Sequence, residues 1–246
     1  MVKKPTWVIE KERAKRAAAA DTVWLFGLHA VRDALRNPAR EVLRLVVTKD
    51  AEAKLAEAIA PVPLDPGAVH QGAAIEVIPR EWGDWRALAR GQGTRPVVVL
   101  LDRVSDPHNV GAILRSAEVF GATAVIAPAR HSAPETGALA KTASGALERM
   151  PYIRVGNLGD AMEALKADGF WVIGLAEEGD STVDALATSH ADAPIALVLG
   201  AEGPGLRDRT RSLCDVLAKI PFARDFGSLN VSNAAAVALY ALTKGA

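Results

Sequence analysis

The segment GAEGPGL, from Gly200 to Leu206, places one acidic residue among three glycines and follows the apolar run IALVL. Glycine-rich loops after a strand often close on a phosphate, but this spacing matches neither the Walker loop nor the dinucleotide fingerprint. Pro204 removes a backbone donor, and the Glu202 carboxylate would repel a pyrophosphate. The loop therefore suits a ligand without phosphates, including a cationic one. A tight turn with Glu202 in solvent is the alternative interpretation.

A second segment, residues 102–122, leaves an apolar run through a polar turn and enters a predicted amphipathic helix. Asn109 lies near the predicted helix start, where an asparagine commonly caps and where backbone amides favour an anion. Arg115 follows six residues later, between apolar residues. Taken alone, Asn109 is best explained as a plain helix cap and Arg115 as a surface cation.

Metal and cysteine chemistry are not expected. Asp102, Asp106 and His108 lie in one turn, but their spacing fits no standard metal site. Cys214 is the only cysteine, which excludes an internal disulfide and a cysteine-based zinc site. Its apolar neighbours favour a buried side chain over a nucleophile.

The third segment, residues 219–242, begins as a short strand, passes through a loop and continues as an alanine-rich helix from near Asn230. Strands are predicted upstream where apolar runs alternate with helical stretches, at 97–102, 123–128, 152–155, 170–175, 195–200 and 216–220. This alternation predicts a doubly wound parallel α/β sheet, whose ligand should lie beyond the carboxyl ends of the strands.

The N-terminal part has a different pattern. A helix at 27–38, a strand at 43–49, a helix at 51–60 and a strand at 73–79 predict a small α/β domain over residues 21–90. GQGTRP, residues 91–96, reads as a linker to a second domain at 97–246.

The net charge is zero, which argues against a generic nucleic-acid binder, but residues 1–20 carry six basic and two acidic side chains. This basic tail could hold RNA phosphates or simply solubilise the chain end. The longest apolar runs are strand-sized and residues 1–16 lack a signal-peptide core. A cytoplasmic protein without membrane segments is expected.

Together, the three segments resemble the three motifs of the SpoU (TrmH-type) RNA ribose 2′-O-methyltransferases of the SPOUT class. The motifs are N-x-x-x-x-x-R at 109–115, L-G-x-E-x-x-G-L at 199–206, and I-P followed by S-L-N-V-S at 220–232. GLHAVRDAL and VHQG resemble the ribosomal-protein-like RNA-binding domain of the bacterial 23S rRNA guanosine methyltransferases, which implies that His70 and Gln71 contact RNA.

The resemblance implies a C-terminal trefoil knot, an obligate homodimer, and methyl transfer from S-adenosylmethionine to a ribose 2′-hydroxyl, of a guanosine in 23S rRNA by the subgroup. It assigns cofactor binding to Gly200, Ile220 and Leu229, with Leu199, Pro221 and Ser228 close by. It assigns catalysis to Arg115, with Asn109, Glu202 and Asn230 as orienting residues. Arg115 would act as a base or, more easily for a guanidinium, would stabilise charge.

The sequence departs from the family pattern at two places. Phe222, Ala223 and Arg224 stand where many relatives have a glycine, and Asn233 replaces a common valine. Three alternatives remain: a tRNA methyltransferase, a non-catalytic RNA-binding assembly protein on the same scaffold, and a Rossmann-like dehydrogenase. The second predicts loss of a motif residue, and the third predicts an early G-x-G-x-x-G; the sequence shows neither.

Overall fold

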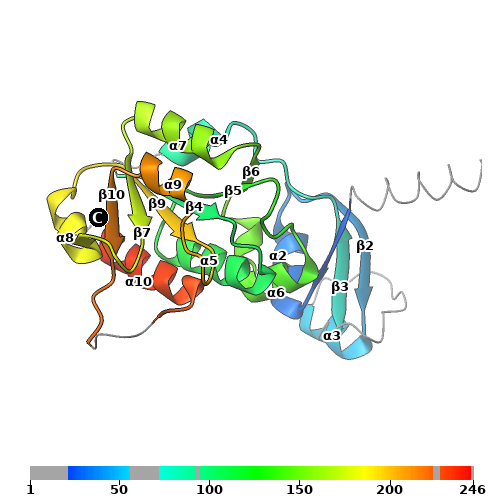
Figure 1. Ribbon diagram of the computed structural model, residues 1–246. Coiled ribbons are helices and arrows are strands. Elements are labelled where there is room, and N and C mark those ends of the chain that lie inside the picture. The colour runs from blue at the N-terminus through cyan, green and yellow to red at the C-terminus, as the bar shows by residue number, and fades with distance from the viewer. Residues whose placement is uncertain (1–21, 56–71, 92–94, 224–227, 245–246) are drawn as a thin grey trace, which may run out of the picture.

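The computed structural model describes residues 22–55, 72–91, 95–223 and 228–244, apart from the side chains of residues 52–54. Two sheets organise the described chain, a smaller one in the N-terminal part and a larger one in the C-terminal part (Figure 1). Among the described helices, none combines the length and apolarity that crossing a membrane requires.

The small sheet is antiparallel, in the order β1-β3-β2. Its elements, with the helices that accompany it, are β1 (Val23–Phe26), α2 (Leu28–Arg36), β2 (Val42–Val47), α3 (Lys49–Leu55) and β3 (Ala73–Val77). The described parts of the predicted helices and strands are confirmed, but β1 was not predicted, and residues 56–60 of the helix predicted at 51–60 lie outside the described residues. His70 and Gln71 lie outside the described residues.

The large sheet has seven parallel strands in the order β6-β5-β4-β9-β7-β10-β8. The strands are β4 (Val97–Asp102), β5 (Ala124–Pro128), β6 (Tyr152–Val155), β7 (Trp171–Leu175), β8 (Ser181–Thr182), β9 (Ile195–Gly200) and β10 (Val216–Lys219). All six predicted strands are present because their continuous apolar runs suit a sheet that is buried on both faces.

Helices cover both faces of the large sheet, as predicted (Figure 1). They are α4 (Trp85–Arg90), α5 (Pro107–Val119), α6 (Gly137–Ala143), α7 (Leu158–Ala167), α8 (Val183–Ser189), α9 (Asp208–Leu213) and α10 (Val231–Thr243), with the 3-10 turn η1 (Ala146–Glu148). Helices α5, α6, α8 and α10 contribute to one buried cluster, and α4 and α7 contribute to another.

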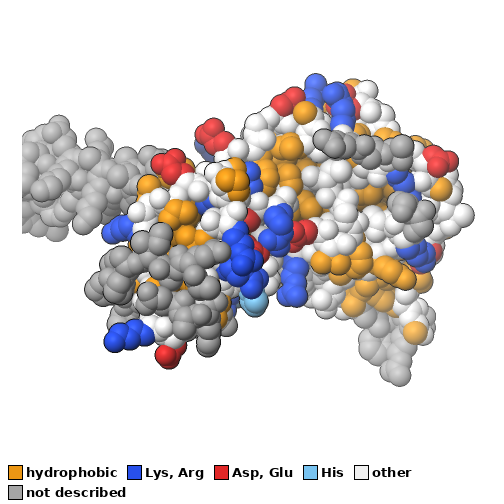
Figure 2. All heavy atoms as spheres, turned by 180° about the vertical axis from the view of Figure 1, so that it is seen from behind, with side chains coloured by type: hydrophobic (Ala, Val, Ile, Leu, Met, Phe, Trp, Pro, Cys, Tyr) orange, Lys and Arg blue, Asp and Glu red, His pale blue; other side chains and the backbone are white. Residues whose placement is uncertain are grey.

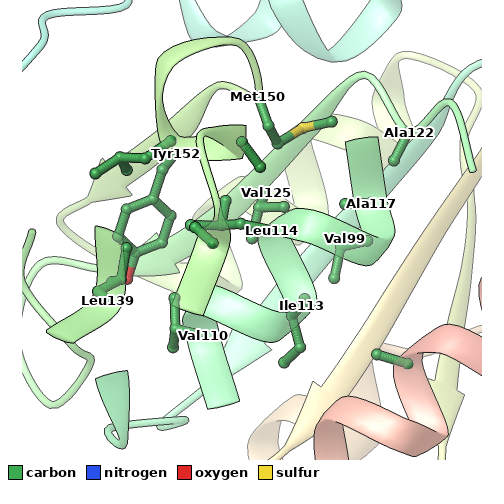
Figure 3. Close-up of a cluster of buried hydrophobic side chains, with 14 of the residues drawn as sticks. Val99, Val110, Ile113, Leu114, Ala117, Ala122, Val125, Leu139, Met150 and Tyr152 are labelled. Carbon is green, nitrogen blue, oxygen red and sulfur yellow. The ribbon is translucent and has the colours of Figure 1, made fainter. Parts of the chain in front are cut away.

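The core beneath α5 is made by aliphatic side chains from helix and sheet (Figure 3). Leu114 is fully buried and lies near Val125 of β5, with Val110 and Ile113 on neighbouring turns of α5. Burying such a side chain stabilises the fold by about 1.5–3 kcal/mol. The packing fixes α5, and with it the polar residues of its first turn.

The small sheet packs directly against α6. A Cβ at Gly137 would lie 2.0 Å from the Phe26 ring and 2.9 Å from the Trp24 carbonyl oxygen, so only glycine permits this approach. Beside it, Arg40 forms an ion pair with Glu148 of η1, at 2.8 Å. The N-terminal part therefore meets α6 and η1 of the C-terminal part through packing and a buried charge pair, and the residue limits of the two predicted domains stay a prediction.

Candidate active site

A cavity of about 540 Å³ opens at the carboxyl ends of β7 and β9. Three segments form most of its lining: the end of β7 with the residues that follow, the glycine loop after β9, and the chain around the start of α10. This is the sheet edge that the predicted parallel topology designates for a ligand. Its volume is in the range of small-molecule sites.

The glycine loop is a tight turn closed by Ala201 and Gly205, where the Gly205 amide donates to the Ala201 carbonyl oxygen at 3.0 Å. Gly203 and Gly205 have φ values of 84° and 66°. A Cβ at Gly200 would lie 2.2 Å from the Gly205 carbonyl carbon, so the two backbone segments can pass only because residue 200 is glycine. The loop thus presents backbone to the cavity.

Three of the four predicted catalytic residues share hydrogen bonds. The Asn230 amide nitrogen donates to Asn109 Oδ1 at 3.0 Å and also to a carboxylate oxygen of Glu202. The Asn230 Oδ1 accepts from the Ser232 amide at 2.9 Å and thereby caps α10. Glu202 is therefore not merely solvated, and its carboxylate is held at the mouth of the cavity.

Asn109 does not cap α5, contrary to the simplest interpretation of the sequence. Asp106 is the cap, accepting from the His108 amide at 3.0 Å, and Pro107 occupies the first helical position. Asn109 lies one turn into the helix and is buried, with its side chain facing α10. The hydrogen bond from Asn230 to Asn109 therefore joins the start of α10 to the first turn of α5.

Arg115 lies on the exposed side of α5 and does not line the cavity. Its side chain has no hydrogen-bond or ion-pair partner among the residues that the structure describes. Its guanidinium is therefore free to bind a group from outside the chain.

Five of the six predicted cofactor residues line the cavity: Leu199, Gly200, Ile220, Ser228 and Leu229. Pro221 does not line it, although its two neighbours do. Sequence reasoning missed the residues after β7, Ala176 to Glu178, and Arg211 of α9. The rule that ligands bind at strand ends points to the β7 residues, whereas the position of Arg211 depends on tertiary packing.

The cavity is acidic. Among the described residues, Glu177, Glu178 and Glu202 line it against a single cation, Arg211. Arg211 pairs with Glu178 and donates from Nε to the Leu206 carbonyl oxygen at 3.2 Å. Hydrogen bonds from its own backbone amide and from Arg211 hold the pKa of Glu178 below its ordinary value. The other two carboxylates, those of Glu177 and Glu202, have no ion pair with any described residue, which disfavours phosphates and favours a positively charged ligand.

The polar residues after β4 serve the fold. Asp102 is buried and accepts from the Arg207 amide at 3.0 Å and from its Nε at 2.7 Å. His108 Nδ1 lies 3.1 Å from Thr142 Oγ1 of α6. No cluster of three or more His, Cys, Asp or Glu side chains that could hold a metal occurs within the described ranges.

Cys214 is half-buried, with its sulfur 3.3 Å from the Thr210 carbonyl oxygen. Burial raises the pKa of its thiol to about 11. At neutral pH the thiol is therefore protonated, which argues against a nucleophilic role.

This chain is similar to known RNA methyltransferases. The SpoU rRNA Methylase family model matches residues 96–240. A 23S rRNA (guanosine-2′-O-)-methyltransferase RlmB from Pseudomonas aeruginosa is 38% identical over 240 residues, covering 89% of this chain and 95% of the relative. An uncharacterized tRNA/rRNA methyltransferase from Synechocystis sp. is 46% identical over 176 residues, 70% of this chain but 45% of that relative's length.

Among solved structures, the SpoU methyltransferase AviRb from Streptomyces viridochromogenes, in complex with the cofactor AdoMet, matches with a TM-score of 0.77. The two chains are 25% identical, and the match covers 94% of this chain and 92% of AviRb. The resemblance predicted from the three motifs is confirmed, and the chain belongs to the SpoU rRNA methylase family.

Proposed function

We propose that this chain transfers a methyl group from S-adenosylmethionine to the ribose 2′-hydroxyl of a guanosine in 23S rRNA. The observation that carries the proposal is the acidic cavity at the strand ends, where Asn230 in the lining donates hydrogen bonds both to Glu202 and to the buried Asn109. The names of the RlmB relatives support the substrate, and the AdoMet complex of AviRb supports the cofactor.

The cavity residues fit S-adenosylmethionine. Gly200 leaves a backbone wall where any side chain would collide, and Leu199 and Leu229 supply apolar surface for an adenine ring. The carboxylates of Glu177 and Glu202 suit a ligand that carries a sulfonium charge and an ammonium group. When bound, the cofactor supplies an electrophilic methyl group.

Arg115 is proposed as the residue that assists the 2′-hydroxyl. The reaction needs an aligned oxygen and loss of its proton, so positioning supplies much of the rate. The planar guanidinium can hold a phosphate and stabilise a developing alkoxide with parallel hydrogen bonds. Asn230 would fix Glu202 and Asn109 around the acceptor ribose. A role as a base would require the guanidinium to lose a proton, which an arginine side chain almost never does. Stabilising the developing charge requires no such loss and is therefore the easier role.

A homodimer is proposed through α5 and α10. Val119 of α5 and Val237 and Tyr240 of α10 have exposed fractions of 69%, 44% and 57%. The Tyr240 ring meets Phe120 edge-on, with 6.0 Å between centroids, so these apolar side chains belong to one surface. Apolar side chains also gather over part of the larger lobe in Figure 2. Arg115 lies one helical turn from Val119 and would therefore border the partner.

The resemblance supports the remaining assignments. The knot, RNA contacts at His70 and Gln71, and a cytoplasmic location are proposed on that basis. The small sheet lies against α6, close to the first turn of α5, which is compatible with RNA reaching from one part to the other.

Two measurements test the function. Calorimetry with S-adenosylmethionine, NAD and ATP should show binding of the first alone; tight binding of NAD without S-adenosylmethionine would refute the cofactor. Mapping 2′-O-methyl positions in total RNA from cells with and without the protein should reveal one lost 23S rRNA guanosine. Loss of a tRNA methylation would favour the tRNA enzyme, and an unchanged map would favour the non-catalytic assembly protein.

A further inference from the structure

Most exposed cations of the described chain are already engaged. On one side of the large sheet, Arg86 pairs with Asp168 at 4.0 Å, Lys166 with Asp215 at 2.6 Å, and Arg209 with Asp160 at 3.9 Å. The three cations belong to α4, α7 and α9, which lie together in Figure 1. Their charge is largely neutralised within the protein.

Three further exposed cations differ, as Arg115 does. Arg103 follows β4, Arg130 follows β5, and Lys141 lies on α6. None of the three side chains forms a hydrogen bond or ion pair with any residue in the described part of the chain. The carboxylate that precedes Arg103 in sequence, Asp102, is occupied by Arg207.

The register of the sheet places these cations beside the cavity. Asp102 pairs with Gly200, and Leu100 pairs with Ile126, so Asp102 stands level with Pro128. Neighbouring strands lie about 4.8 Å apart. Arg103 therefore leaves the sheet between the glycine loop on one side and the loop that carries Arg130 on the other.

The first turn of α5 extends the same edge to α6. His108 Nδ1 lies 3.1 Å from Thr142 Oγ1, and Lys141 is the neighbour of Thr142 in sequence. The Asp106 carboxylate lies in the same turn, where it caps α5. The cations thus run from the cavity mouth toward α6, against which the small sheet packs.

The backbone of these loops is unusual. Of the described non-glycine residues, only Arg103, His131 and Ser144 have left-handed φ values, of 61°, 63° and 51°. Such a conformation costs roughly 1–2 kcal/mol per residue and tends to persist at functional sites. Two of the three are basic side chains in the adjacent loops after β4 and β5.

We propose that Arg103, Arg130 and Lys141 form a track for RNA phosphates that leads the substrate strand from the small sheet to the cavity. The proposal rests on the proposed function and adds the surface that receives the RNA. Unpaired cations give up only counterions when they bind a phosphate, whereas cations of existing ion pairs must also break a bond. The track explains how a chain without net charge can hold RNA.

The test compares two triple variants with the same change in charge. Arg103→Gln/Arg130→Gln/Lys141→Gln removes the track, and Arg86→Gln/Lys166→Gln/Arg209→Gln removes the paired cations of α4, α7 and α9. Affinity for a 23S rRNA transcript is measured over a salt series, with S-adenosylmethionine binding and thermal unfolding as checks of the fold. Loss of three phosphate contacts should weaken binding at least about tenfold at low salt and reduce the log–log salt slope by about 2.

Both checks of the fold should match wild type for the track variant, and the control variant should bind RNA like wild type. Wild-type affinity and slope in the track variant, or an equal loss in both variants, would overturn the track. If the wild-type protein methylates the transcript and the track variant binds it normally, the track alone is refuted. Wild-type protein that neither binds nor methylates the transcript refutes the proposed function as well.

Discussion

The Arg40–Glu148 ion pair and the Asn109–Asn230–Glu202 network both join distant segments, but they differ in burial and in completeness. The side chains of Arg40 and Glu148 have exposed fractions of 0% and 3%. Arg40 also donates to the Ile78 carbonyl oxygen, and Asn37 donates to Glu148, both at 2.9 Å. The buried pair is fully bonded within the protein.

The network at the cavity is exposed at Glu202 and Asn230. The Glu202 carboxylate accepts from Asn230 and can accept further hydrogen bonds. Because Arg40 and Glu148 are bonded entirely within the protein, their role is to hold the N-terminal part against η1. The cavity network keeps unused donors and acceptors where a ligand can reach them. Substitutions in the first region should therefore change stability, and those in the second should change binding or rate.

The largest effect is expected for Glu148→Ala. It leaves the Arg40 guanidinium buried without its main carboxylate, which typically costs about 3–5 kcal/mol. Urea unfolding should report this as a lower midpoint. Arg149→Ala is the matched control, because Arg149 is half exposed and its pairs with Asp33 and Glu118 should contribute less than about 1 kcal/mol. Equal losses in the two variants would contradict the structural role of the buried pair.

A smaller effect is expected for Gly200→Ala, on cofactor binding. The added methyl group collides with the backbone at Gly205, and overpacking of this kind costs about 1–3 kcal/mol, which corresponds to a roughly 5- to 150-fold loss of affinity if the loop shifts out of its binding position. Calorimetry with S-adenosylmethionine measures the change. Gly156→Ala, where the methyl group meets no atom within 4 Å, should bind normally. Unchanged affinity in Gly200→Ala would show that the loop does not shape the cofactor site.

The smallest effect on stability is expected for Asn230→Ala, which removes the cap of α10 at about 1 kcal/mol. Asn230→Ser can still cap the helix but loses the amide that donates to Asn109 and Glu202. Thermal unfolding should therefore be near wild type for the serine variant, while methyl transfer falls in both variants. Normal transfer by Asn230→Ser would remove the network from the mechanism.

Local sequence patterns predicted much of the fold and the glycine loop. The strands of the large sheet are continuous apolar runs, and their carboxyl ends define where the cavity lies. The turn at Gly200 to Gly205 depends on glycines that are visible in the sequence. Helix α10 begins at Asn230 as predicted, because an asparagine cap is a local signal.

Features that depend on distant contacts could not be predicted. Arg40 and Glu148 are 108 residues apart, and nothing near either residue indicates the other. Short elements such as β1 and α6 have too few residues for a clear period, and α6 is fixed by its packing on α5 and β1. The predicted cap at Asn109 was wrong because Asp106, three residues earlier, competes for the same role.

The most direct test of the account is single-turnover methyl transfer from labelled S-adenosylmethionine to a 23S rRNA transcript, by wild-type protein and by Arg115→Lys. Lysine keeps the charge but loses the planar fork, so the rate should fall about a hundredfold or more if Arg115 stabilises transition-state charge. Cofactor affinity should stay unchanged, because Arg115 does not line the cavity. A near-normal rate in Arg115→Lys, or a loss of S-adenosylmethionine binding in proportion to the loss of rate, would contradict the account.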